Sequence, residues 1–330
     1  MKLVVAGATG LVGQEILKVL QEHQIKIDEL IPIASEKSIG KTIKFDDREF
    51  KICSFEEALS KNPCAAIFSA GKEVSLKWAP EFAKHKIKVI DNSSAWRMKK
   101  EIKLIVPEVN AEQLNEKDYI IANPNCSTIQ LVVVLWPLHK FYGLKRIIVS
   151  TYQSVSGSGY KGINQLFLER NSKIVENPAY PHQIDLNCIP HGGSFMDNDY
   201  TEEEMKLVNE SSKILSIPNL KISGTVVRVP VIGGHSESVN IEFQKTPDIQ
   251  ELKSILKSSP GIILEDNPGE NKYPMPLNVR GKDAVFVGRI RKDLSNENAV
   301  NLWIVADNLR KGAATNAVQI LEYLLKNNLL

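Results

Sequence analysis

The sequence has few cysteines, no long apolar segment and almost no net charge. Its four cysteines show neither the spacing of a metal site nor the density of a disulfide-stabilised scaffold: Cys53, Cys64, Cys126 and Cys188. The longest apolar run contains Gln130 and Pro137 and falls far short of a membrane span. The N-terminal residues run directly into glycines, without a secretory signal. We therefore expect a reduced, cytoplasmic protein that holds no metal.

The charge balance argues against highly charged partners. Lys and Arg number 41 and Asp and Glu 39, which gives a net charge of +2. Nothing in that balance predicts binding to nucleic acid or to a membrane surface, whereas an anionic small molecule needs only local positive charge. A chain of 330 residues with 43% hydrophobic residues is long enough for two domains with cores of their own.

The chain opens with a strand, a glycine-rich turn and a helix. Residues 3–6 are β-rich, Gly7–Gly13 has the spacing GxxGxxG, and residues 14–20 have helical periodicity. This order is the phosphate-binding opening of a doubly wound fold, although a tight turn without a ligand is the alternative. The candidate cofactor contacts here are Gly7, Thr9, Gly10, Leu11, Val12 and Gly13.

The second strand, expected at residues 29–34, ends without the acidic residue that grips the ribose in many NAD enzymes. Ser35, Lys37 and Ser38 follow it, and this small cationic loop suits the 2′-phosphate of NADP. The alternative is a solvated charged loop, and Glu36 weakens the cationic character.

Further strands are expected at residues 65–70 and 88–90, so the chain up to Asn125 reads as one α/β domain. A polar loop, residues 91–97, leaves the second of these strands. Arg97 in it is a candidate anion ligand, or else a surface arginine stacked on Trp96.

A turn at residues 123–128, Asn-Pro-Asn-Cys-Ser-Thr, precedes a long apolar run that ends near Gly143. We expect this run to be a helix, with Ser127 and Thr128 as caps. Cys126 would then lie where free backbone N–H groups and the helix dipole stabilise a thiolate. The alternative is a small buried cysteine.

Beyond Gly143 strands outnumber helices, which predicts a mostly antiparallel sheet with a few covering helices. The expected strands are residues 146–152, 226–231, 239–243, 285–290 and 302–305. Residues 177–199 read as a long loop, and Thr201 with Glu204 as a capping box. We expect a second domain at residues 126–308, and a final helix, 309–330, that joins the Rossmann-like dinucleotide-binding domain of residues 1–125.

Residues 228–237 are the second chemically informative stretch. A strand delivers Arg228, and two glycines bend the chain so that His235 can face a cleft. A histidine paired with a cysteine is a common way to form and use a thiolate. The alternative is a structural loop histidine, which is also how we interpret His182 and His191.

In combination and in order, these motifs resemble the aspartate-semialdehyde dehydrogenase family over nearly the whole chain. The matching segments are GATGLVG, NSSAWRM, NPNCST, YQSVSGSG, EEMK, RVPVIGGHSES and DNLRKGAATNAVQI. One departure is the glycine-rich loop His191–Ser194, where members of the family usually carry fewer glycines.

The resemblance implies a role for each matching residue. Cys126 would be the nucleophile, His235 the acid/base, and Gln153 would orient the acyl group. Arg228 and Glu203 would hold the carboxylate and ammonium of the substrate. Phosphate would be received by Arg97, Asn125 and Lys206, and the nicotinamide side would be lined by Ser156, Gly157 and Asn316.

The implied reaction is the NADPH-dependent conversion of L-aspartyl 4-phosphate to L-aspartate 4-semialdehyde through a thioester on Cys126. It leads toward lysine, methionine and threonine. The resemblance also implies a homodimer, with residues 126–308 as the catalytic and dimerisation domain. One alternative is N-acetyl-glutamyl-phosphate reductase, whose motif usually reads Asn-Pro-Gly-Cys against Asn125 here. Another is a non-catalytic paralogue, which would have no chemical need for Cys126, Gln153, Arg228 and His235 together.

Overall fold

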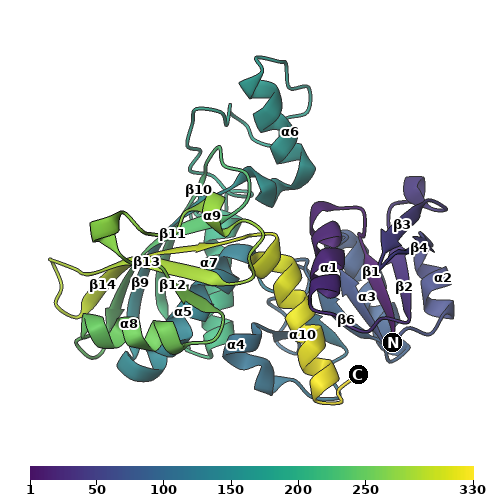
Figure 1. Ribbon diagram of the computed structural model, residues 1–330, viewed down its shortest axis with the longest axis horizontal. Coiled ribbons are helices and arrows are strands. Elements are labelled where there is room, and N and C mark those ends of the chain that lie inside the picture. Colours follow the sequence, from purple (N-terminus) through teal and green to yellow (C-terminus); the bar gives the residue numbers. More distant parts are fainter. The chain divides into compact units, whose positions relative to one another are not determined.

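The computed structural model describes all 330 residues, and they form two compact units (Figure 1). The first unit contains Met1–Asn125 and Ala313–Leu330, and the second contains Cys126–Gly312. No helix has both the length and the apolar character needed to cross a membrane.

The first unit is built on a six-stranded parallel sheet with the order β2-β1-β5-β6-β8-β7. The strands are β1 (Lys2–Ala6), β2 (Glu29–Ile33), β5 (Ala65–Phe68), β6 (Lys88–Asp91), β7 (Lys103–Leu104) and β8 (Ile120–Ala122). Because β2 lies on one side of β1 and β5 on the other, the order of the strands reverses beside β1. Ligands of doubly wound folds bind at such a reversal, and the predicted Rossmann-like class is confirmed.

Helices cover both faces of this sheet, and the strand residues alternate between them. Leu3 and Val5 pack toward α1 (Leu11–Glu22) and α10 (Thr315–Lys326). Val4 and Ala6 face the opposite way, into the core that contains α2 (Phe55–Ser60) and α3 (Lys72–Lys84). The remaining elements of the unit are α4 (Pro107–Asn110) and a hairpin of β3 (Thr42–Phe45) and β4 (Arg48–Lys51).

The second unit contains a six-stranded mixed sheet with the order β10-β9-β11-β14-β13-β12. Its strands are β9 (Leu144–Gln153), β10 (Lys221–Arg228), β11 (His235–Phe243), β12 (Ile262–Leu264), β13 (Val285–Lys292) and β14 (Ala299–Ala306). The three inner pairings are antiparallel, as predicted, but both edge strands pair in parallel. β11 begins at His235, earlier than the predicted residue 239, so this histidine belongs to a strand instead of a loop.

Three helices pack on one face of this sheet: α5 (Cys126–Tyr142), α7 (Glu202–Leu215) and α8 (Ile249–Ser258). α5 is buried on nearly all sides, which explains its apolar, β-branched sequence. The predicted capping box of α7 is present, because the Thr201 and Glu204 side chains each bind the other's backbone N–H. α6 (Gly159–Arg170) projects away from the sheet (Figure 1), α9 (Pro276–Val279) lies near β14, and a π-helical turn, Arg310–Ala314, leads toward α10.

Candidate active site

Cys126 is the first residue of α5 and is partly exposed, so the helix predicted after the Asn-Pro-Asn turn begins at the cysteine itself. At this position the first backbone N–H groups and the positive end of the helix dipole favour a thiolate. Ser127 and Thr128 lie inside the first turn, so the prediction that they cap the helix is wrong in position.

The hydroxyl of Ser127 binds Gln153, the last residue of β9. Gln153 Nε2 donates to Ser127 Oγ at 3.0 Å, and both side chains are buried. The amide oxygen of Gln153 has no hydrogen-bond partner. A buried acceptor beside the helix that carries Cys126 is therefore available to a bound molecule.

His235 is completely buried, and its ring is held in one protonation state. The backbone N–H of Ser154 donates to His235 Nδ1 at 3.0 Å, so that nitrogen is an acceptor and the ring proton lies on Nε2. Nε2 itself has no partner in the protein. Burial, and then the nearby Arg228 cation, lower the pKa of His235 to about 3. The ring is therefore a neutral hydrogen-bond donor at Nε2.

Asn308 organises the segment that holds this ring. Its Oδ1 accepts hydrogen bonds from Ser154 Oγ, Ser156 Oγ and the backbone N–H of Gly234, at 3.0, 3.0 and 3.1 Å. Asn308 could not be identified from the sequence, since an asparagine after a strand carries no signal of such a role.

Gly157 brings Arg228 and His235 to one place. A β-carbon at position 157 would lie 3.0 Å from Arg228 Nη1 and 3.2 Å from His235 Nε2. A side chain here would be crowded against both groups, so glycine at position 157 avoids a clash with the guanidinium and the ring. The cation and the ring N–H therefore face the same small volume.

Glu203 and Lys206, both in the first turns of α7, form an ion pair and are both mostly buried. The glycine-rich loop His191–Ser194 packs against this helix start. The Glu203 N–H donates to the Gly192 carbonyl, and a β-carbon at position 192 would lie 3.0 Å from the Glu203 side chain and 2.7 Å from Val226. Glycine is thus required at position 192 to seat Glu203.

In the first unit, a pocket of about 700 Å³ opens at the reversal beside β1. A β-carbon at Gly7 would lie 2.2 Å from the Ser69 carbonyl oxygen, and one at Gly13 would lie 2.1 Å from the Gly7 carbonyl oxygen. These two glycines therefore allow the close approach of β1, β5 and α1 that shapes the pocket. Of the predicted cofactor residues, Gly7, Thr9, Gly10 and Ser35 line it, whereas Leu11, Val12, Gly13, Lys37 and Ser38 do not.

Three further residues that line this pocket could not be identified from the sequence. Phe55 and Trp78 stack with ring centroids 4.7 Å apart, and Lys77 lies over the Trp78 ring at 5.0 Å. Because they come from two separate helices, α2 and α3, no contiguous sequence motif identifies them. A stacked aromatic wall, a glycine turn and a lysine fit the base and phosphates of a dinucleotide.

The loop that carries Arg97 is organised by the buried Asp91. Its carboxylate accepts hydrogen bonds from the hydroxyls of Ser75 and Ser93, and Trp96 Nε1 donates to Ser75 Oγ at 2.8 Å. Arg97 Nη2 donates to the Asn92 carbonyl, and only 8% of the residue is exposed. The alternative of a surface arginine is therefore wrong.

Asn316 and Asn125, two further predicted site residues, are buried in the first unit. Asn316 Nδ2 donates to Asn123 Oδ1 at 2.6 Å and to the Ile105 carbonyl at 2.9 Å. These bonds tie α10 to the turn before Cys126, and a contact of Asn316 with nicotinamide stays a prediction.

Comparison with known proteins agrees with this arrangement. Residues 2–117 match the NAD-binding domain of semialdehyde dehydrogenases, and residues 135–311 match the dimerisation domain of semialdehyde dehydrogenases. A dinucleotide-binding unit joined to a unit that presents a cysteine at a helix start defines an oxidoreductase of the semialdehyde dehydrogenase class.

Individual relatives narrow this class. The chain is 48% identical over 337 residues to the aspartate-semialdehyde dehydrogenase of Aquifex aeolicus (strain VF5), which covers 100% of this chain and 99% of that protein. The crystal structure of aspartate semialdehyde dehydrogenase II from Vibrio cholerae complexed with ASA matches with a TM-score of 0.94 and 44% identity, over 99% of this chain and 98% of that one. An enzyme from Candida albicans, solved with NADP, matches at 0.78 and 25%, over 100% and 99%. This chain belongs to the aspartate-semialdehyde dehydrogenase family, whose reaction in amino-acid biosynthesis it catalyses.

Proposed function

We propose that Cys126 is the nucleophile of the reaction and forms a thioester with the substrate. Its place as the first residue of α5 is the observation that carries this assignment. In the biosynthetic direction the thiolate attacks the acyl carbon of L-aspartyl 4-phosphate, and phosphate leaves with the electrons of the broken C–O bond. A thiolate is nucleophilic enough for this step, and the thioester is electrophilic enough to be reduced.

The remaining groups of the second unit act on the same carbon. NADPH, when bound, supplies a hydride to the thioester carbonyl. The oxyanion that results accepts hydrogen bonds from His235 Nε2 and from amides at the start of α5, and its collapse releases the Cys126 thiolate and L-aspartate 4-semialdehyde. The ring state of His235 supports the donor half of the acid/base role assigned from sequence, because only Nε2 bears a proton. Gln153, which Ser127 holds beside the start of α5, orients the acyl group.

The ends of the substrate are held by Arg228 and Glu203. The guanidinium of Arg228 binds the α-carboxylate with two parallel hydrogen bonds, and Glu203 pairs with the α-ammonium. Lys206, Arg97 and Asn125 receive phosphate. The proximity of Arg228 to His235 across Gly157 supports this assignment, since it places a carboxylate ligand beside the proposed reacting centre.

The pocket of the first unit holds NADP in this proposal. Gly7, Thr9 and Gly10 approach the pyrophosphate, and Ser35 with the adjoining Lys37 and Ser38 binds the 2′-phosphate. On the second unit, Ser156 and Gly157 lie on the nicotinamide side. The absence of an acidic residue at the end of β2 favours NADP over NAD, although Glu36 lines the pocket and opposes an added phosphate.

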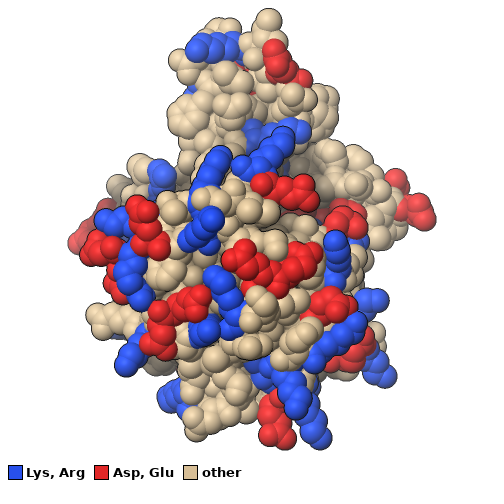
Figure 2. Space-filling model, turned by 90° about the vertical axis from the view of Figure 1, so that its right-hand side faces the viewer, with Lys and Arg blue, Asp and Glu red and all other residues tan.

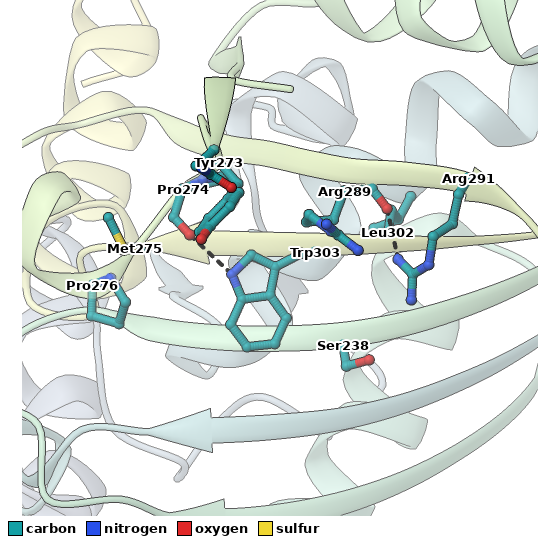
Figure 3. Close-up of a pocket in the computed structure, with 10 residues that line it drawn as sticks. Ser238, Tyr273, Pro274, Met275, Pro276, Arg289, Arg291, Leu302 and Trp303 are labelled. Atoms are coloured by element: carbon teal, nitrogen blue, oxygen red, sulfur yellow. Dashed lines mark hydrogen bonds between the residues drawn. The ribbon is translucent and has the colours of Figure 1, made fainter. Parts of the chain in front are cut away.

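We also propose a cytoplasmic homodimer. The sheet face opposite α5 exposes Ile148 and Tyr152 by more than a third, and Tyr152 lies 5.4 Å from the Trp303 ring. Trp303 and Ser238 line a hollow of about 420 Å³ on this unit (Figure 3). Exposed aromatic residues of this kind mark association surfaces. On the face in Figure 2, by contrast, positive and negative side chains are interspersed.

This interface is tested by the mass of the protein in solution. Tyr152→Asp should give the monomer mass in solution, and an unchanged dimer mass would contradict this interface.

The nucleophile is tested by trapping. Mass spectrometry of enzyme quenched during turnover should find the acyl adduct on Cys126, and Cys126→Ala should fold normally and have no activity. Cys64 and Cys188 are exposed and serve as internal controls for non-specific labelling. An adduct on Cys53, Cys64 or Cys188 with none on Cys126 would refute the assignment.

A further inference from the structure

Asn308 lies just beyond β14, next to the place where β11 begins. His235, the first residue of β11, pairs with Ala306, the last residue of β14. The chain turns after this pair, and the turn is fixed by Asp307, whose carboxylate accepts from the Leu309 N–H at 2.9 Å. Asn308 is the residue inside the turn and is only 3% exposed. Its side chain is therefore buried beside the strand end that carries His235.

A single oxygen of this side chain holds three groups. Asn308 Oδ1 accepts from Ser154 Oγ and Ser156 Oγ, both at 3.0 Å, and from the Gly234 N–H at 3.1 Å. An amide oxygen has two lone pairs, so the three donors share it. The two hydroxyls lie 2.7 Å apart, so one serine can donate to the other instead. The buried Gly234 N–H has no such alternative, and loss of the acceptor would leave it unsatisfied.

Two of these groups reach His235, one at its backbone and one at its ring. Gly233 and Gly234 have φ of 79° and 83°, so the bend before His235 is a glycine conformation that no side chain of its own restrains. The bond from Gly234 to Asn308 supplies that restraint. At the ring, the Ser154 N–H donates to His235 Nδ1 at 3.0 Å, and the hydroxyl of the same serine is held by Asn308. One atom, Asn308 Oδ1, therefore holds both contacts of the histidine in place.

We propose that Asn308 is a positioning residue: its amide oxygen fixes the Gly234 backbone and the Ser154 side chain, and so keeps the His235 Nε2 donor directed at the reacting centre. The inference rests on the proposed function, because Asn308 acts on the reaction only through His235. Arg228 and Glu203 hold the substrate in that function. The effect of Asn308 should therefore appear in kcat and leave KM for L-aspartyl 4-phosphate unchanged.

Two substitutions separate the acceptor from the shape of the side chain. Asn308→Leu has a similar shape and removes the acceptor, so kcat should fall at least about tenfold, because reacting groups tolerate little misplacement. Asn308→Asp keeps an oxygen that accepts from the same three donors, so kcat should stay within about threefold of wild type. If Asn308→Leu does not fold, Asn308→Ala, which also removes the acceptor, carries the test.

Two measurements show whether the effect passes through the histidine. The double variant of Asn308→Leu and His235→Gln should be no slower than His235→Gln alone, because the effects of residues that act as a unit do not add. Without turnover, hydrogen exchange of the Gly234 amide should be faster in Asn308→Leu and should match wild type in Asn308→Asp.

Asn298→Leu is the matched control. Asn298 comes directly before β14, and its Oδ1 accepts from Thr246 Oγ1 at 2.5 Å. The substitution removes an amide acceptor at the opposite end of the strand from Asn308. It should leave kcat and the exchange of the Gly234 amide unchanged, whatever it does to the thermal midpoint.

Each outcome decides the proposal. A loss of kcat in Asn308→Leu with retention in Asn308→Asp supports it. Wild-type kcat in Asn308→Leu, an equal loss in Asn308→Leu and Asn308→Asp, or a double variant slower than His235→Gln overturns it. Failure of the proposed function is seen separately, as wild-type kcat in His235→Gln, and exchange of the Gly234 amide does not depend on that function.

Discussion

Gly312 lies directly against Cys126, because a β-carbon at position 312 would come within 2.8 Å of the Cys126 β-carbon. Contacts this short do not persist, so Gly312→Ala must displace the cysteine or the π-helical turn that contains Gly312. We expect kcat to fall at least about tenfold with little change in KM, since reacting groups tolerate little misplacement. Gly269→Ala is the matched control, as only Asn267 lies near its added carbon, at 3.6 Å. Equal rates in the two variants would show that the sulfur is not displaced.

Cofactor preference should depend on lysine side chains near the pocket of the first unit. Lys37→Ala should weaken the binding of NADP and leave the binding of NAD almost unaffected, because the two cofactors differ only in the 2′-phosphate. A charge-assisted hydrogen bond contributes about 1.5–3 kcal/mol, or roughly tenfold to a hundredfold in affinity. Lys77→Ala is the informative comparison, since Lys77 lines the pocket and Lys37 does not. If only Lys77→Ala changes the ratio of kcat/KM for the two cofactors, the assignment of Lys37 is wrong.

Arg228 and Glu203 should discriminate the two ends of the substrate. Arg228→Lys keeps the charge but loses the planar pair of donors, so kcat/KM should fall at least tenfold, about 1.4 kcal/mol. Glu203→Gln should lower kcat/KM by a similar factor with L-aspartyl 4-phosphate. It should lower kcat/KM much less with an N-acylated analogue, which has no ammonium group. The thermal midpoint should be measured alongside, because a merely structural arginine would change that value and leave the kinetics per folded molecule unaltered.

His235 should make the folded state less stable as the pH falls below about 6.5. Its folded pKa is about 3, whereas the ordinary imidazole value is 6.5. Between those values the unfolded chain binds a proton that the folded chain does not. The free energy of unfolding therefore falls on acidification, by up to about 1.4 kcal/mol per pH unit. His235→Gln should lose less stability than wild type over this range, and the exposed His182→Gln should follow wild type. Equal acid sensitivity of wild type and His235→Gln would contradict the buried neutral ring.

Local signals were sufficient for much of the fold. The glycine turn after β1, the start of α5 at Cys126 and the capping box at Thr201 each depend on residues within a few positions of one another. Periodicity found the inner strands of the second sheet, but the parallel pairing of β10 and β12 could not be read from it. Pairing direction depends on how the connecting segments pass across the sheet, and a strand's own residues do not record this.

The parts of the site that the sequence did not reveal are assembled from distant segments. Asn308 holds the segment of Ser154 and Gly234, and Phe55 meets Trp78 across two helices. Glu237 reads as the polar position of an alternating strand, although it points into the core. A glutamate has no sequence mark of burial, because burial is a property of what packs upon it.

The contact between Gly312 and Cys126 also joins the first and last residues of the second unit. In the first unit, Asn123 Nδ2 donates to the Ala313 carbonyl at 3.2 Å, so the two ends of the break in that unit are neighbours as well. The second unit is therefore an insertion with adjoining termini, an arrangement that tolerates excision and circular permutation. The proposed nucleophile is the first inserted residue, so any exchange of the inserted unit would also replace the reacting sulfur.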